Sequence, residues 1–318
     1  MKLQTYIPIT VKENQIDYTS SILLLGSCFV ENIGEKLDDV KFQTLQNPFG
    51  ILFHPIAIEK IIVRALTNVP FTEEEVFFKN EHWYCFEVHS TINATNRDEF
   101  LTLLNSKLAA LKEYLINSSH IILTFGTAWI YRFLETQKIV ANCFKIPQKE
   151  FDKELLLVGE ISNSISNIIS LIEKHNPKAS IILTVSPVRH LKDGFIENNL
   201  SKAHLITAIH QVLNSKVVSG RHHYFPSYEI MMDELRDYRF YKEDMIHPNN
   251  IAVSIIWEAF NKAWITSKTE SLQKEIKSIQ SGLKHKPFNP DSKEHQLFLK
   301  GLRAKIITLK ERIPYLKF

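Results

Sequence analysis

This sequence has few cysteines, no long apolar run and no visible targeting segment. It has 3 cysteines among 318 residues, and they form no C-x-x-C pair. This argues against a disulfide framework and against a cysteine-based zinc site. No apolar run approaches the roughly 18 residues that a membrane-spanning helix needs, so no membrane span is expected. The opening residues lack a basic segment and an apolar core, so no signal peptide is visible and a cytoplasmic location is expected.

An excess of charge of one sign is also lacking. The 38 lysines and arginines nearly balance 35 aspartates and glutamates, which gives a net charge of +3. A protein that binds phosphate backbones is normally far more basic, so nucleic acid is not an expected partner. The histidines show no H-x-x-x-H or comparable ligand spacing, and no metal is expected. A hydrophobic content of 44% with 23% charged residues is ordinary for a folded globular protein.

Short apolar runs alternate with longer amphipathic stretches along the chain, which predicts an α/β protein with a parallel sheet. The apolar runs are continuous, as in strands that are buried on both faces. The expected strands are 22–25, 120–125, 180–185 and 222–225. The expected helices are 30–39, 153–175, 199–214 and 251–264.

Two segments interrupt this alternation. Aromatic and β-branched residues around Lys79-Asn80-Glu81 predict a β-hairpin, followed by a helix at about 97–116, so a first insertion covers about 71–118. A second, smaller hairpin is expected within an insertion at about 129–147.

The composition changes at about residue 266 to Lys, Glu, Gln and Leu. Two helical stretches there are separated by Lys286-Pro287-Phe288-Asn289-Pro290, which predicts a helical hairpin. The expected organisation is an α/β domain over 1–265 and a C-terminal helical hairpin over 266–318.

Two small nucleophilic side chains follow the first expected strand. Ile22-Leu23-Leu24-Leu25 runs through Gly26 into Ser27 and Cys28, just before an amphipathic helix. This order places Ser27 or Cys28 at a helix N-terminus on the carboxyl edge of the sheet, where N–H groups and the helix dipole favour an oxyanion or a thiolate. The alternative is that Cys28 is a small apolar filler and Ser27 an N-cap.

A carboxylate and a histidine lie three residues apart before the last expected helix, in Asp244-Met245-Ile246-His247-Pro248. On a turn, Asp244 can reach the imidazole of His247 and set its tautomer, which leaves the other ring nitrogen free to accept a proton from a nucleophile. A surface helix cap is the alternative interpretation. Because Cys28 and His247 are far apart in the sequence, only the fold can bring them together.

Five motifs together resemble a known family. They are Gly26-Ser27-Cys28-Phe29-Val30, Asn47-Pro48-Phe49-Gly50, Phe125-Gly126-Thr127-Ala128-Trp129, Ser186-Pro187-Val188-Arg189-His190 and Asp244-Met245-Ile246-His247-Pro248. The family that they resemble is the bacterial GSCFA-domain family, which is similar to a branch of the SGNH (GDSL-like) hydrolases. The resemblance covers about residues 20–265.

The resemblance implies a flavodoxin-like three-layer α/β/α sandwich with a site that hydrolyses acyl esters or transfers acyl groups. It implies a small-molecule or carbohydrate acyl ester as substrate and no cofactor. The Gly-Asp-Ser block of the SGNH enzymes, laid on Gly26-Ser27-Cys28, places Cys28 at the nucleophile and Ser27 at the aspartate. A shift of one residue would restore Ser27 as the nucleophile, so both remain candidates. The fifth block matches Asp244 and His247.

Two further blocks of the resemblance supply candidate oxyanion donors. The second-block glycine corresponds to Gly50, in the same motif as Asn47, and its N–H can approach a substrate because no Cβ intervenes. The third block, normally Gly-x-Asn, reads Gly126-Thr127-Ala128. Loss of the asparagine donor would cost about 3 kcal/mol of transition-state stabilisation. Either Thr127, Trp129 or Asn142 replaces it, or the site is slow or does not hydrolyse.

Two more residues are candidates for the substrate pocket. His89 follows a strand-like run in the first insertion, where the alternative is a histidine bonded to a backbone carbonyl. Arg189 lies after the expected strand 180–185 and is placed to hold an anionic group, or else belongs to a solvated turn.

The sequence thus supports three functional hypotheses. The first is an ester hydrolase or acyltransferase that uses Cys28 or Ser27 with His247 and Asp244. The second is a binding module that keeps the fold, recognises an acylated or glycan ligand and has lost efficient catalysis. The third is an interaction protein that works through its C-terminal hairpin.

Overall fold

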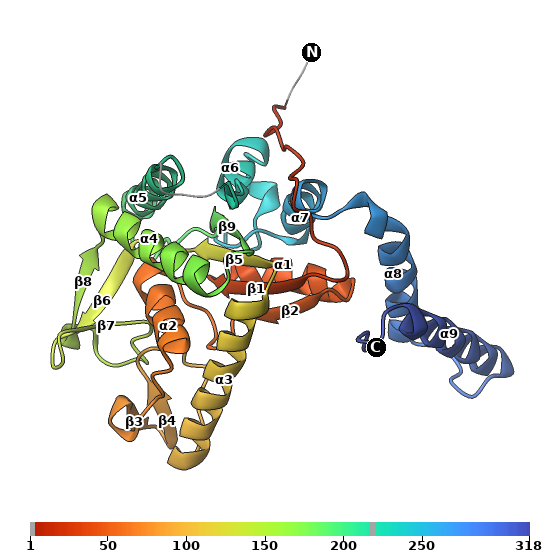
Figure 1. Ribbon diagram of the computed structural model, residues 1–318, viewed down its shortest axis with the longest axis horizontal. Coiled ribbons are helices and arrows are strands. Elements are labelled where there is room, and N and C mark those ends of the chain that lie inside the picture. Colours follow the sequence, from red (N-terminus) through yellow and green to blue (C-terminus); the bar gives the residue numbers. More distant parts are fainter. Residues whose placement is uncertain (1–3, 216–219) are drawn as a thin grey trace.

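A five-stranded parallel sheet forms the centre of the computed structural model, which describes residues 4–215 and 220–318 (Figure 1). Its strands are β1 (Ser21–Gly26), β2 (Gln43–Gln46), β5 (His120–Phe125), β9 (Ser180–Val185) and β10 (His222–Tyr224). Their order across the sheet is β10-β9-β5-β1-β2. If the five strands are numbered 1 to 5 in chain order and read from the β2 edge, the order is 2-1-3-4-5, as in flavodoxin-like proteins. The predicted α/β class is confirmed.

Helices cover both faces of the sheet because the side chains of each strand alternate between two cores. Leu23 and Leu25 point into one core, and Ile22 and Leu24 point into the other. The first core is closed by α2 (Pro55–Thr67), α3 (Arg97–Asn117), α4 (Val158–His175) and α5 (Phe195–Leu213). The second is closed mainly by α1 (Phe29–Asp39) and α7 (Asn250–Trp264). The short helix α6 (Ser227–Glu229) follows β10.

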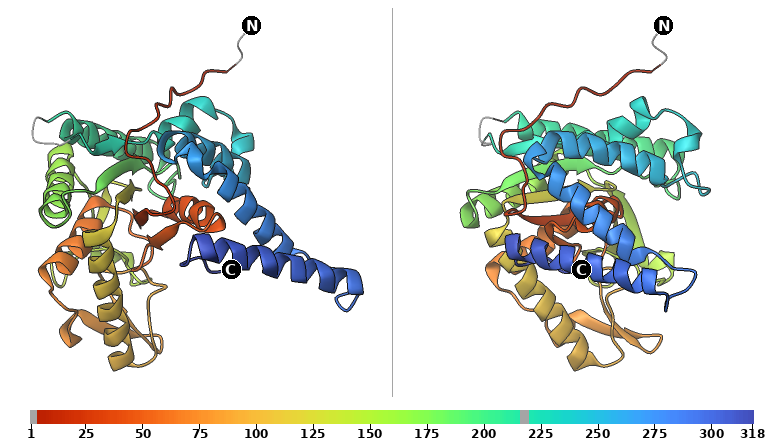
Figure 2. Two further views of the ribbon diagram at one scale, coloured as in Figure 1. Left: turned by 45° about the vertical axis from the view of Figure 1, so that its right-hand side comes forward. Right: turned by 90° about the vertical axis from the view of Figure 1, so that its right-hand side faces the viewer.

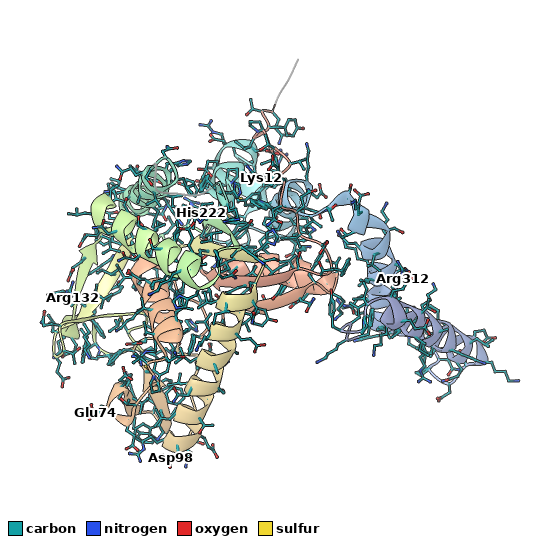
Figure 3. The ribbon with its side chains drawn as sticks, viewed as in Figure 1. Lys12, Glu74, Asp98, Arg132, His222 and Arg312 are labelled. Atoms are coloured by element: carbon teal, nitrogen blue, oxygen red, sulfur yellow. The ribbon has the colours of Figure 1, made fainter. Side chains whose placement is uncertain are left out.

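The first insertion contains the expected hairpin, formed by β3 (Val76–Lys79) and β4 (His82–Cys85). Asn80 and Glu81 have positive φ angles of 47° and 63°, as a tight two-residue hairpin turn requires. Arg64 of α2 joins this insertion to the sheet domain through ion pairs with Glu75 and Glu87. Glu74 and Asp98 mark its outer end (Figure 3).

The second insertion is larger than a hairpin. It is a three-stranded antiparallel sheet of β6 (Trp129–Phe133), β7 (Lys138–Val140) and β8 (Phe151–Leu155), in the order β7-β6-β8. The helix expected from residue 153 therefore begins only at Val158. Pairing with β6 overrides the helical pattern of these residues, and Arg132 of β6 pairs with Glu154 of β8 at 2.6 Å.

Strand β2 and helix α2 were not among the expected elements. β2 is an edge strand whose sequence, Gln-Thr-Leu-Gln, carries no apolar run. Helix α2 begins with a cap, because His54 Nδ1 accepts a hydrogen bond from the Ala57 N–H, and Pro55 occupies its first turn. The segment between these two elements contributes Ile51, Phe53 and His54 to the cavity described below.

The C-terminal hairpin consists of α8 (Glu270–Lys284) and α9 (Lys293–Arg312) and projects from the side of the sheet domain (Figure 2). It is joined to the second core through the buried side chains of Ile276, Ile279 and Leu309. The Tyr315 hydroxyl donates to the Tyr18 carbonyl at 2.6 Å. None of the helices in the described ranges combines the length and apolarity needed to cross a membrane.

Candidate active site

Ser27 and Cys28 occupy the turn between β1 and α1. The Ser27 side chain is 0% exposed, and its Oγ has no hydrogen-bond partner among the described residues. Cys28 is the N-cap residue of α1 and its side chain is half-buried. Its backbone N–H donates to no carbonyl in the described part of the chain. Of the two nucleophile candidates, Cys28 is therefore the one that faces open space.

A cavity of about 510 Å³ lies at the carboxyl edge of the central sheet, next to Cys28. Strand order reverses between β1 and β5, and α/β proteins bind ligands at such a point. The second insertion forms one wall, and the segments after β9 and before α7 form another. The lining side chains include those of Cys28, Phe53, Trp129, Asn142, Arg189 and His247.

His247 lies on the turn before α7 and lines this cavity together with Cys28. Its Nδ1 is 2.7 Å from Oδ2 of Asp244, while Oδ1 of Asp244 accepts from the backbone N–H groups of Ile246 and His247. These two N–H groups and the imidazole hold the pKa of Asp244 at about 2. The carboxylate is thus ionised at neutral pH and sets the Nδ1–H tautomer of His247, with Nε2 as the available base.

Arg189 holds the turn that carries this pair. Its guanidinium donates to the Met245 carbonyl at 3.0 Å, and its backbone N–H donates to the Ile246 carbonyl. Met245 has a φ of 56°, a left-handed conformation that these bonds help to maintain. The guanidinium also lies over the rings of Phe195 and Tyr241. Arg189 also lines the cavity, and its guanidinium and backbone N–H both donate to carbonyls of the turn.

Gly50 was expected to present its N–H to the substrate, but it does not line the cavity. Its N–H donates to the Asn47 carbonyl at 2.8 Å, and its φ of 71° forms the turn after β2. Asn47 Oδ1 accepts from the Gly26 N–H, and its Nδ2 is buried without a partner among the described residues. The next residue, Ile51, does line the cavity, and no carbonyl of the described chain accepts from its N–H.

Thr127 lines the cavity, but its hydroxyl is already engaged. Its Oγ1 accepts from the Trp129 N–H and lies 3.1 Å from Oγ of Ser201. The Trp129 indole N–H donates to the Glu197 carbonyl. Among the three expected substitutes for the missing asparagine, Asn142 has the freest donor: its Oδ1 accepts from the Phe144 N–H, and no described residue accepts from its Nδ2.

Gly126 separates Ser27 from a second histidine. A Cβ at Gly126 would lie 3.2 Å from both Ser27 Cβ and His190 Nε2, so only glycine fits here without displacing a neighbour. Burial, and then the nearby charges of Lys202 and His247, lower the pKa of His190 to about 3, which keeps it neutral. The other expected histidine, His89, bonds Thr91 Oγ1 through Nδ1 and does not line the cavity.

Lys202 of α5 ends beneath the same edge of the sheet. Its ammonium donates to the carbonyls of Gly126 at 2.6 Å and Ser186 at 2.8 Å, and the side chain is 1% exposed. Burial lowers the pKa of Lys202 to about 7, and Cys28 acts in the opposite direction.

The thiol of Cys28 experiences opposing influences. Burial and then Glu31 raise its pKa, whereas Lys202, the Cys28 N–H and Lys242 lower it. The net direction is upward. A resting thiol at this position is therefore mostly protonated at neutral pH, and attack requires a base.

Sequence reasoning placed His190 at this edge only as the last residue of the Ser186–His190 motif, without its burial, and it missed Lys202. Lys202 did leave a detectable pattern: with Asn198, Leu205 and Ile209 it falls on the buried face of α5 at helical spacing. A lysine on an otherwise buried face is unusual. His190 left no such pattern, because its burial depends on Phe53 and Gly126 from distant segments.

Within the described ranges, no group of three or more His, Cys, Asp or Glu side chains is arranged to hold a metal ion. The cavity is instead lined by two thiols, imidazoles, an amide, the Asp193 carboxylate and two cations, Arg189 and Lys192. This arrangement can perform nucleophilic attack with proton transfer.

Comparison with protein families gives two matches. Residues 21–260 match the model described as GSCFA family, and residues 276–318 match the one described as GSCFA domain protein, C-terminal domain. The first match spans both Cys28 and His247. No curated protein matches the chain.

Among solved structures, the chain is similar to an acetyl xylan esterase (Est2A) from the rumen bacterium Butyrivibrio proteoclasticus. The two are 11% identical, with a TM-score of 0.39, over 78% of this chain and 65% of that one. The chain thus spans 65% of the length of that structure. A likeness this distant says nothing about the activity of the present protein.

Proposed function

The chain belongs to the GSCFA family, and we propose that it is an esterase-type hydrolase or acyltransferase of the SGNH kind, with Cys28 as its nucleophile. One observation carries the proposal: Cys28 and His247 line the same cavity, and the far nitrogen of His247 is bonded to Asp244. A nucleophile, a base and a group that orients the base are the components of covalent acyl transfer.

In the proposed first step, Nε2 of His247 takes the thiol proton as Cys28 Sγ attacks the ester carbonyl carbon. The carbonyl π electrons move onto oxygen, and the oxyanion is received by the N–H groups of Cys28 and Ile51, which have no carbonyl partner in the described chain. Asp244 stabilises the imidazolium. The C–O bond then breaks, the leaving alcohol takes the proton from His247, and a thioester remains on Cys28.

In the second step, water or another alcohol attacks the thioester carbonyl carbon with His247 as the base, the C–S bond breaks, and the Cys28 thiolate takes the proton back from His247. Water completes a hydrolysis, and an alcohol completes an acyl transfer. Asn142 Nδ2 supplies a third contact to the oxyanion in place of the missing asparagine. The substrate that this site would accept is a small-molecule or carbohydrate acyl ester.

A binding module without efficient catalysis is the second candidate. The raised pKa of Cys28 and the engaged Thr127 hydroxyl favour it, because both reduce catalytic power. This candidate predicts saturable binding of acylated glycans without turnover.

Short-chain nitrophenyl esters and acetylated sugars separate the two candidates. The enzyme proposal predicts sustained product release and an acyl adduct in the intact mass of the protein, both lost in Cys28→Ala. Absence of turnover and adduct in the wild-type protein, with ligand binding retained, would favour the binding module.

A further inference from the structure

The C-terminal hairpin carries a disproportionate share of the positive charge of the chain. Residues 266–318 contain 12 of the 38 lysines and arginines but only 5 of the 35 aspartates and glutamates. The rest of the chain is therefore net negative, and the near-neutral total combines two regions of opposite sign. All 12 cations of the hairpin are exposed. Within residues 4–215 and 220–318, only Lys284 and Arg312 among them form an ion pair.

Exposed aromatic side chains lie at the tip of the hairpin. Phe288, on the segment between α8 and α9, is fully exposed. It borders a groove of about 540 Å³ together with Phe298, which is 43% exposed. The rings of His285 and His295 lie beside Phe298, with centroid distances of 6.0 and 6.2 Å. The tip thus presents an apolar surface that no described part of the chain covers.

Helix α9 extends this surface along one of its faces. Its buried side chains, Leu302 and Leu309, pack into the second core. Residues that follow one another at intervals of three and four share a helix face. On the opposite face, these intervals give one exposed row of Lys293, Leu297, Lys300, Ala304 and Ile307. Leu297 is 69% exposed and Ile307 60%, so α9 has apolar residues on two faces and only one of these faces is packed.

The kind of cation on the hairpin favours one class of partner. Ten of the 12 are lysines. Interfaces between proteins are enriched in arginine and depleted in lysine. Anionic lipid headgroups, by contrast, attract lysine and arginine alike and require no fixed geometry. Helices that combine many such cations with exposed phenylalanine and leucine bind at the bilayer interface. A lipid surface therefore fits the hairpin better than an acidic protein does.

We propose that the C-terminal hairpin is a peripheral binding surface for bilayers that contain anionic lipids. Phe288 enters the headgroup region, and the lysines of the tip and of α9 contact the headgroups. The hairpin projects from the side of the sheet domain, so it reaches the bilayer while the net negative remainder of the chain stays away from it (Figure 2). The proposal does not depend on the chemistry at Cys28.

The first experiment measures sedimentation of the full-length protein with vesicles of phosphatidylcholine, with and without phosphatidylglycerol. The protein should bind the vesicles that contain phosphatidylglycerol and not the neutral ones. Added salt should weaken this binding, because it screens the attraction between exposed charges. Binding to neither kind of vesicle, or equal binding to both, would overturn the proposal.

Two variants test the lysines and the tip. Lys286→Gln should weaken vesicle binding about fivefold, the usual effect of one cation at an anionic surface. Its matched control is Lys178→Gln, which removes an exposed lysine from the turn before β9 and should leave binding unchanged. Phe288→Ser should weaken binding about tenfold. Its control is Phe78→Ser, a change at a residue of β3 that is 57% exposed.

These variants should fold as the wild-type protein does, because Phe288 and Lys286 are exposed and contribute no core contact. Wild-type binding by either hairpin variant, or an equal loss in its control, would contradict the proposed surface. Labelled polyglutamate and duplex DNA are tested at the same salt concentration. Binding to either polymer without binding to vesicles would replace the bilayer with an acidic protein or a nucleic acid as the partner. No ester is used, so the outcome is independent of the proposed catalysis.

Discussion

Ser27 and Cys28 are neighbours in the chain, but the Ser27 side chain is buried in the protein interior and the Cys28 side chain faces the cavity. The Ser27 hydroxyl is enclosed between β1 and Gly126 without a hydrogen-bond partner in the described structure, whereas the Cys28 thiol lines the cavity. The turn from β1 into α1 separates the two side chains.

This difference predicts which residue reacts. A thiol-directed probe should label Cys28, and a hydroxyl-directed probe should not label Ser27. Peptide mapping of both reactions checks this. Labelling of Ser27, or wild-type activity in both Cys28→Ala and Ser27→Ala, would contradict the proposed mechanism.

Ser27→Ala should make the protein more stable. A buried hydroxyl without a partner costs about 1 kcal/mol or more, and alanine removes that cost. Urea unfolding measures the change. Ser186→Ala is expected to change stability in the opposite direction. The Ser186 Oγ accepts a hydrogen bond from the Val188 N–H, and its removal should destabilise the protein.

His247→Ala should reduce kcat/KM about 10²- to 10⁴-fold, the usual contribution of a general base. Asp244→Asn should also lower kcat strongly, because the amide no longer stabilises the imidazolium. Both residues are exposed enough that the melting temperature should change little. Asp193→Asn, a carboxylate of the same cavity that pairs with Lys153, is the matched control and should have a much smaller effect on kcat. A similar loss in all three variants would indicate a general electrostatic effect instead.

Stability should fall in acid partly because of His54. Burial lowers its pKa to about 4, from an unfolded value of about 6.5. The unfolded chain thus binds a proton more readily than the folded protein, and the free energy of unfolding decreases as the pH falls from about 6.5 to 4, by about 1.4 kcal/mol per pH unit for this group. His54→Asn keeps an acceptor for the Ala57 N–H and should flatten the dependence. Equal slopes for both proteins in urea unfolding between pH 7 and 4 would refute this.

Gly126→Ala should destabilise the protein by about 1–3 kcal/mol, because the added methyl group meets three neighbours at 3.2 to 3.3 Å in a packed interior. It should also impair activity by displacing His190 or Ser27. Gly159→Ala is the control: nothing lies within 4 Å of its Cβ position, and alanine favours the helix it occupies. Unfolding and ester hydrolysis should both be measured.

The C-terminal hairpin should contribute to the stability of the whole protein. Ile276 is 0% exposed, and Ile276→Ala should cost about 2–5 kcal/mol. Ile307, which is 60% exposed on α9, should tolerate the same change within about 0.5 kcal/mol. Truncation after about Ser267 should likewise expose core side chains and lower the stability of the whole protein.

Much of the fold could be predicted from local pattern. Strands β5 and β9 were predicted at their observed bounds, because a short continuous apolar run between turns is typical of a buried strand. β8 was mistaken for the start of a helix, since its polar residues owe their extended form to pairing with β6. The pairing of strands is a property of distant segments, and no local window contains it.

The candidate site divides in the same way. The chain order alone determined that a small nucleophile stands at a helix N-terminus and that a carboxylate precedes a histidine by three residues, because both are local arrangements. Only the tertiary structure decided that Ser27 is enclosed while Cys28 lines the cavity, that the Gly50 N–H is bonded within a turn, and that the Lys202 ammonium is buried against the Gly126 and Ser186 carbonyls. Burial and the partners of a polar atom depend on side chains that the fold brings from far along the chain, and these determine which groups are free to react.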